Sequence, residues 1–128
     1  MRPLAWAFFL SLALAQTGPY QRFCAQCHGE RGQGARPYPG FSALLKDRLF
    51  ETPEGRRYLV QVVLYGRKTE TLLMPGFAHL KDEEVAQALN QVLSLLGVKA
   101  SPFTPEEVRK ERERPLAPEE VKRPSPPR

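Results

Sequence analysis

The chain has 128 residues, of which 41% are hydrophobic and 26% are charged, with a formal net charge of +5. This length is enough for one small hydrophobic core. Residues 16–98 carry ten basic and eight acidic side chains, and residues 99–128 carry eight and six. Neither part is a polycation, so we expect no nucleic acid partner.

The first 15 residues resemble a removable signal peptide. They begin with a basic MRP, continue with the apolar run LAWAFFLSLAL and end in an A-x-A-like cleavage site. An uncleaved anchor is the alternative, but the run is shorter than the roughly 20 residues that span a bilayer. We therefore expect a soluble, monomeric product, periplasmic or otherwise exported, with no transmembrane segment in its mature form.

A short helix is predicted from Gly18 to Cys27, and it delivers the motif Cys24-Ala25-Gln26-Cys27-His28. This is the pattern of c-type haem attachment. Two thiols roughly one helical turn apart can add to the two vinyl groups of a porphyrin. The imidazole of His28 can then coordinate the iron from the proximal side.

Three other interpretations of this motif stay open. The two cysteines could form a structural disulfide, or a redox pair beside a βαβ unit, although no βαβ pattern is visible. A zinc site would need two further ligands, and His79 is the only other histidine or cysteine in the chain.

Residues 29–40 hold four glycines and two prolines, which predicts a loop that could fold back along a flat ligand. The next segment, residues 41–50, mixes helical and irregular signals. From it we predict only that four side chains are buried: Phe41, Leu44, Leu45 and Leu49.

Two clear helices follow. The first begins with Thr52 as cap and Pro53 in the first turn, and Gly66 ends it. The second, residues 82–96, starts with three acidic residues at its positive end and is followed by Gly97. Its apolar stripe should pack across the first helix near Tyr20 and over one edge of the porphyrin: Val85, Leu89, Val92, Leu93 and Leu96.

A polar loop is predicted for residues 67–73, just before Met74-Pro75. Met74 is the only methionine outside the signal peptide, 46 residues after His28. A lone methionine usually fills a core, but a haem needs a sixth ligand, and a thioether there favours the ferrous state and leaves no open position. His79 is the alternative ligand.

The last thirty residues are rich in proline and charge. Two short helices are predicted, after Thr104 and after Ala117, because Pro-Glu-Glu follows each. A disordered tail is the alternative to a tail that wraps the body through about residue 123. The candidate anchors are Phe103, Val108, Leu116 and Val121.

With these pieces in order, residues 18–97 resemble the class I cytochromes c, which are small monohaem electron carriers. The segments YLVQVVLYG, AHLKDEEVAQALN and PFTPEEV are similar to the long-tailed members from thermophilic bacteria that donate electrons to a terminal haem-copper oxidase. The resemblance implies an all-α fold of three to four helices around one covalent haem c. It divides the chain into a signal peptide (1–15), a haem domain (16–98) and a tail (99–128).

The resemblance also implies that the carbonyl of Pro39 accepts the Nδ1 proton of His28, with Pro37 as the alternative. The helix-crossing glycine of the family corresponds to Gly18, which stands two residues closer to Cys24 than usual, so the crossing should be looser. The expected cofactor ligands are therefore Cys24, Cys27, His28, Pro39 and Met74, with His28 and Met74 on the iron.

The function implied is single-electron transfer in a respiratory chain, between a redox protein donor and acceptor, with no enzyme activity. The haem edge near the thioethers is the expected exit route, and a ring of cations could steer an acidic partner: Arg22, Arg36, Arg67, Lys68 and Lys81. The alternatives are a haem enzyme or gas sensor with an open sixth position, and a relay subunit of a larger periplasmic complex.

Overall fold

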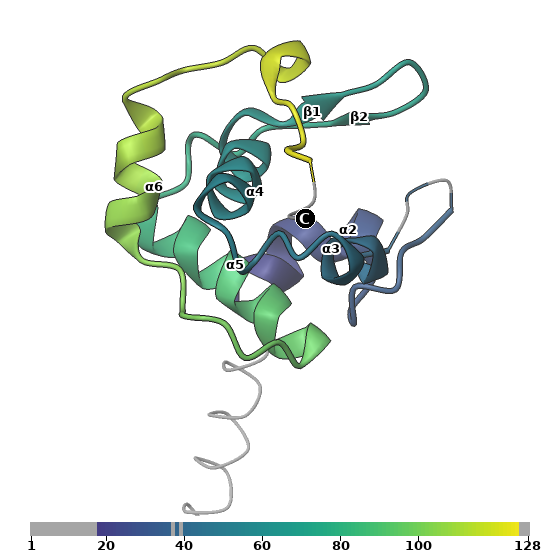
Figure 1. Cartoon of the computed structure of the whole chain (residues 1–128). Coiled ribbons are helices and arrows are strands. Elements are labelled where there is room, and N and C mark those ends of the chain that lie inside the picture. The colour runs from purple at the N-terminus through teal and green to yellow at the C-terminus, as the bar shows by residue number, and fades with distance from the viewer. Residues whose placement is uncertain (1–17, 37, 39, 126–128) are drawn as a thin grey trace, which may run out of the picture.

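The computed structural model describes residues 18–36, 38 and 40–125. The expected signal peptide and the two prolines of the haem loop, Pro37 and Pro39, lie outside the described residues. The described part is mainly helical, as predicted, with one small sheet (Figure 1). Its elements are η1 (Tyr20–Cys24), α2 (Ala25–His28), α3 (Ser42–Lys46), α4 (Pro53–Tyr65), β1 (Arg67–Lys68), β2 (Leu73–Met74), α5 (Asp82–Leu96), α6 (Pro105–Arg112) and η2 (Pro118–Glu120).

The two long helices, α4 and α5, have the boundaries that their caps predict. Thr52 Oγ1 accepts a hydrogen bond from the Gly55 N–H at 3.0 Å and so satisfies a free donor at the start of α4. Glu84 does the same for α5, where its carboxylate accepts from the Lys81 N–H at 3.0 Å. Gly66 (φ 77°) and Gly97 (φ 67°) end the two helices with positive φ, and Gly97 has the left-handed helical conformation.

The N-terminal helix crosses α5 through Gln91. The Tyr20 N–H donates to Gln91 Oε1 at 2.9 Å, and Gln91 Nε2 donates to Gln21 Oε1 at 2.9 Å. A Cβ on Gly18 would lie 2.5 Å from Gln91 Nε2, so Gly18 allows this close approach. The side chain of Gln91 thus fastens the crossing. The sequence predicted a looser crossing and did not indicate this contact.

Two predictions in the middle of the chain were wrong. Leu49 is buried, and Phe41 and Leu44 are partly buried, but Leu45 is 43% exposed. Neighbouring side chains on a helix point about 100° apart, and in α3 Leu44 faces the core while Leu45 faces solvent. The polar loop contains a hairpin, in which β1 pairs with β2 in antiparallel register.

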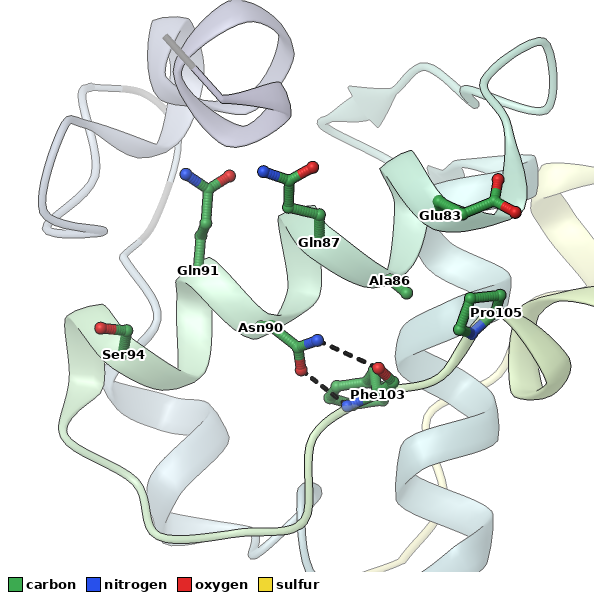
Figure 2. A pocket seen from close by; sticks show the side chains of 8 residues that line it. All are labelled: Glu83, Ala86, Gln87, Asn90, Gln91, Ser94, Phe103 and Pro105. Atoms are coloured by element: carbon green, nitrogen blue, oxygen red, sulfur yellow. Dashed lines mark hydrogen bonds between the residues drawn. The ribbon is translucent and has the colours of Figure 1, made fainter. Parts of the chain in front are cut away.

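The described part of the C-terminal tail, residues 99–125, lies along the body. It packs α6 against α4 and α5, and η2 against β1 (Figure 1). Asn90 fastens its start, donating to the Phe103 carbonyl at 3.0 Å and accepting from the Phe103 N–H at 2.6 Å (Figure 2). Of the predicted anchors, Leu116 is partly buried. The other three are buried: Phe103, Val108 and Val121.

Arginine side chains hold the tail and the body together at three points far apart in the sequence. Arg56 of α4 pairs with Glu107 at 2.9 Å and also donates to the carbonyls of Ser101 and Pro102. Arg112 reaches the segment before α5, and Arg123 reaches α3. The tail is therefore fixed along its length rather than at one end only.

Candidate functional site

A cavity of about 400 Å³ lies between the N-terminal helix, α3, α4, α5 and the hairpin. This volume lies within the range of small-molecule and cofactor sites. Most of its wall is apolar, and the side chains come from all of the surrounding helices, among them Leu44, Phe50, Leu59, Val62, Val63, Ala88, Leu89 and Val92. The stripe of α5 thus contributes to this wall at Leu89 and Val92, where the sequence placed the porphyrin edge.

The predicted ligands that the structure describes all line this cavity. Cys24, Cys27 and His28 come from η1 and α2, and Met74 comes from β2. His79 is not among the described lining residues. Its ring is exposed and lies against two phenylalanines, 6.3 Å from Phe23 and 6.1 Å from Phe77 between ring centroids.

The His28 ring is held by the glycine-rich loop. It stacks on Phe41 with 4.6 Å between centroids and 28° between planes. Gly32 supports this stack, because its φ is 74° and a Cβ there would lie 2.6 Å from Phe41 Cδ2. The loop turns back on the helix through the Gly34 N–H, which donates to the His28 carbonyl at 2.7 Å. The packing of Phe41 therefore orients the imidazole of His28.

The segment that carries Met74 is packed against the end of α4. The Phe77 N–H donates to the Val63 carbonyl at 2.8 Å. A side chain on Gly66 would meet the Met74 carbonyl and would lie 2.8 Å from the Gly76 nitrogen. Only glycine fits there, and this close approach holds the backbone of Met74, a residue that lines the cavity.

Burial controls the ionisation of the first cysteine of the motif and of the tyrosine one turn before it. It raises the pKa of the Cys24 thiol to about 11, with a further contribution from the charge of Cys27. It also raises the pKa of Tyr20 to about 12, and the Tyr20 hydroxyl donates to the Gly29 carbonyl at 2.5 Å. Both groups are neutral near pH 7, as suits an apolar cavity.

These residues fit a haem. Two thiols on one helix can tether the ring, an imidazole and a thioether can ligate the iron, and apolar walls enclose the remainder. Both cysteines are free thiols in the structure, so no disulfide occupies the motif. Within residues 18–36, 38 and 40–125, no cluster of three or more His, Cys, Asp or Glu side chains could hold a metal ion.

Two arginines also line the cavity, and both lie near the same tyrosine. The three residues are Tyr58, Arg67 and Arg123. The sequence placed Tyr58 on an apolar helix face and Arg67 in a ring of surface cations, and it did not single out Arg123. No local pattern could have found Arg123, because only the path of the tail brings it to the cavity. Of the other steering candidates, Arg22 pairs with Glu84 at 3.6 Å and Lys68 with Glu119 at 4.0 Å.

The fold and the donor set define the class of small helical proteins that tether a haem through two thiols. The family model described as "cytochrome C oxidase, cbb3-type, subunit III" matches residues 15–90, which is more than half of the chain. A cytochrome c-552 of Thermus thermophilus is 38% identical over 141 aligned positions, which cover 94% of this chain and 93% of that protein. A second cytochrome c-552 of Thermus thermophilus is 39% identical over 114 positions, covering 77% and 85%.

The chain belongs to the class I c-type cytochromes. It is therefore an electron-transfer protein rather than an enzyme, and its cofactor is a covalent haem c with iron. This agrees with the resemblance found in the sequence. No helix in the described part of the chain has the length and apolar character needed to cross a membrane.

Proposed function

We propose that this protein is an exported monohaem carrier that moves single electrons in a respiratory chain, with His28 and Met74 as the axial ligands of a low-spin iron. The observation that carries the proposal is that both side chains line one cavity, whereas His79 lies outside it. The haem, when bound, supplies a one-electron ferric/ferrous couple.

Each residue of the site has a separate task in this proposal. Cys24 and Cys27 hold the porphyrin edge, and the apolar residues of α4 and α5 exclude water from its faces. His28 would ligate the iron through its imidazole, and a backbone carbonyl of the loop, at Pro39 or Pro37, would accept its Nδ1 proton. Met74 would supply a thioether as the second ligand, which favours the ferrous state and would leave no position for substrate.

The ligand assignment is tested with Met74→Ala and the control His79→Ala in the holoprotein. Met74→Ala should abolish the weak sulfur-to-ferric-iron band at the red edge of the spectrum and lower the midpoint potential, because the iron loses its thioether. His79→Ala should retain both properties. If Met74→Ala keeps the band, or if His79→Ala loses it, the proposed ligation is wrong.

The partners and the location belong to the same proposal. The signal-peptide pattern of residues 1–15 supports export, and the haem domain would then begin at Gln16 and run to residue 98, before the tail. The mass of the mature protein tests this, since cleavage before Gln16 with one haem added gives a single expected value. The acceptor we propose is a membrane-bound haem-copper oxidase. An acidic docking face on that oxidase would be complementary to the cations around the haem edge.

A second candidate function is an internal relay in a larger complex. The description of the family model, which names a subunit of an oxidase, favours this alternative. Sedimentation of the native protein from cell extracts distinguishes the two. A mobile carrier sediments as a free monomer, and a relay subunit sediments with its complex.

A further inference from the structure

Two guanidinium groups share the haem cavity with no acidic side chain among its described lining residues. Arg67 comes from β1, and Arg123 comes from the end of the tail. Both lie near Tyr58, and the Arg67 Cζ is 5.8 Å from the centre of the Tyr58 ring. Burial raises the pKa of Tyr58, and the charges of both arginines act in the opposite direction. An anion in the cavity near Tyr58 would therefore be attracted by both guanidinium groups.

The Arg123 side chain is only partly satisfied by the protein. Its Nη2 donates to the Ala43 carbonyl at 3.3 Å and pairs with Asp47. Its Nε is buried, and none of the described residues accepts a hydrogen bond from it. A buried charged donor without an acceptor is unfavourable, so native structures rarely leave one. Because Asp47 holds the other side of the guanidinium, the Nε–H has a fixed direction and can serve an acceptor beside the cavity.

The cofactor of this family carries the matching group. A haem has two propionate carboxylates, on the edge of the porphyrin opposite the edge that the thiols tether. Carboxylates are the preferred partners of a planar guanidinium, which can offer them more than one N–H group. The thiols come from η1 and α2, whereas Arg67 and Arg123 come from β1 and the tail.

We propose that Arg123, assisted by Arg67, binds a haem propionate, so that the C-terminal tail is part of the cofactor site. This inference rests on the proposed haem site. It gives the tail a second role besides packing: the cofactor itself fastens the part of the tail around Val121, which is 4% exposed. Haem loading and closure of the tail are then coupled, since each stabilises the other.

The test uses three variants of the full-length holoprotein: Arg123→Met, Arg123→Lys and the control Arg109→Met. Arg109 is a tail arginine that pairs with Glu106 and Glu113 of its own helix region and does not line the cavity. Covalent haem content and the low-spin spectrum are measured first in each variant. The readouts are then the propionate bending vibration in resonance Raman spectra and the rate of cleavage at Glu119 and Glu120 by a Glu-specific protease.

Arg123→Met should shift the propionate vibration and speed cleavage of the tail by roughly tenfold or more, because a lost hydrogen bond to a charged group shifts a local opening equilibrium by that factor. Arg123→Lys keeps the charge without the planar fork, so it should give a smaller change in both readouts. The control should leave the vibration where it is in the wild type.

An unmoved propionate vibration in Arg123→Met, with haem fully attached, would overturn this inference. The same result in Arg123→Lys would overturn it if the methionine variant did not retain haem. A wild-type protein without covalent haem or without a low-spin spectrum would instead refute the proposed function, so the two failures are distinguishable.

Discussion

Replacing Arg112 with leucine should loosen the segment that connects Met74 to α5. One guanidinium makes three contacts there: Nε with Asp82 at 2.5 Å, Nη1 with the Ala78 carbonyl at 2.6 Å, and Nη2 with the Leu80 carbonyl. The Leu80 N–H also donates to the Phe77 carbonyl at 3.0 Å, which closes a turn within the segment. Without Arg112, a nearly buried carbonyl at Leu80 has no donor from the tail.

The size of the effect follows from these contacts. Hydrogen bonds to charged groups contribute about 1.5–3 kcal/mol each, and the three share one side chain that is 29% exposed. We expect a loss of about 2–3 kcal/mol in the free energy of unfolding, after allowing for solvent screening. For a chain of this length that corresponds to a fall in Tm of about 6–15 °C.

The assay is thermal unfolding of the holoprotein, followed by circular dichroism and by the red-edge absorption band together. Arg109→Leu is the matched control, because it removes the same side chain from the same helix and breaks only solvent-exposed ion pairs, which contribute little to stability. The absorption band should be lost at a lower temperature in Arg112→Leu than in the control. Equal transitions in the two variants would show that Arg112 does not brace the methionine segment.

Two further predictions concern α6 and the end of α4. The hydrogen bond from Arg56 lowers the pKa of Glu107 in the folded protein. Ionised Glu107 therefore stabilises the fold fully above the ordinary pKa of 4.5, and this stabilisation is lost as the pH falls through the lowered pKa. Glu107→Gln should therefore unfold more easily than wild type by about 1 kcal/mol at pH 7, with the gap closing in acid denaturation below pH 4.5. Gly66→Ala should cost about 2 kcal/mol or more by urea unfolding, against about 1 kcal/mol for Gly97→Ala, because Gly97 also has a positive φ but has open space around it. Equal costs in the two variants would contradict the crowding at Met74.

The features that the sequence predicted correctly are those with local causes. Both ends of α4 and α5 depend on caps, acidic first turns and terminal glycines that lie within a few residues of the boundary. The same holds for α6, where Thr104 caps the helix and Glu107 reaches back to it. The attachment motif is also local, because its chemistry depends on five consecutive residues.

The features that the sequence missed depend on contacts between distant segments. The strands of the hairpin have two residues each, too few for an alternating pattern to show. The fastening of the first helix depends on Gln91, 71 residues from Tyr20 in the chain. Arg123 reaches the cavity only because the tail has already passed over α5, α4 and β1. Tertiary packing decides such positions, and no window of sequence contains them.

The arginine contacts of the tail bear on how long the folded protein lasts. Arg56 and Glu107 are 51 residues apart, and Arg123 and Ala43 are 80 apart. Contacts that close such long loops form late in folding, because the entropy of closure must be overcome first. Interactions absent from the transition state slow unfolding without speeding folding. The tail should therefore act mainly on the lifetime of the native state, because its contacts form last in folding and break first in unfolding.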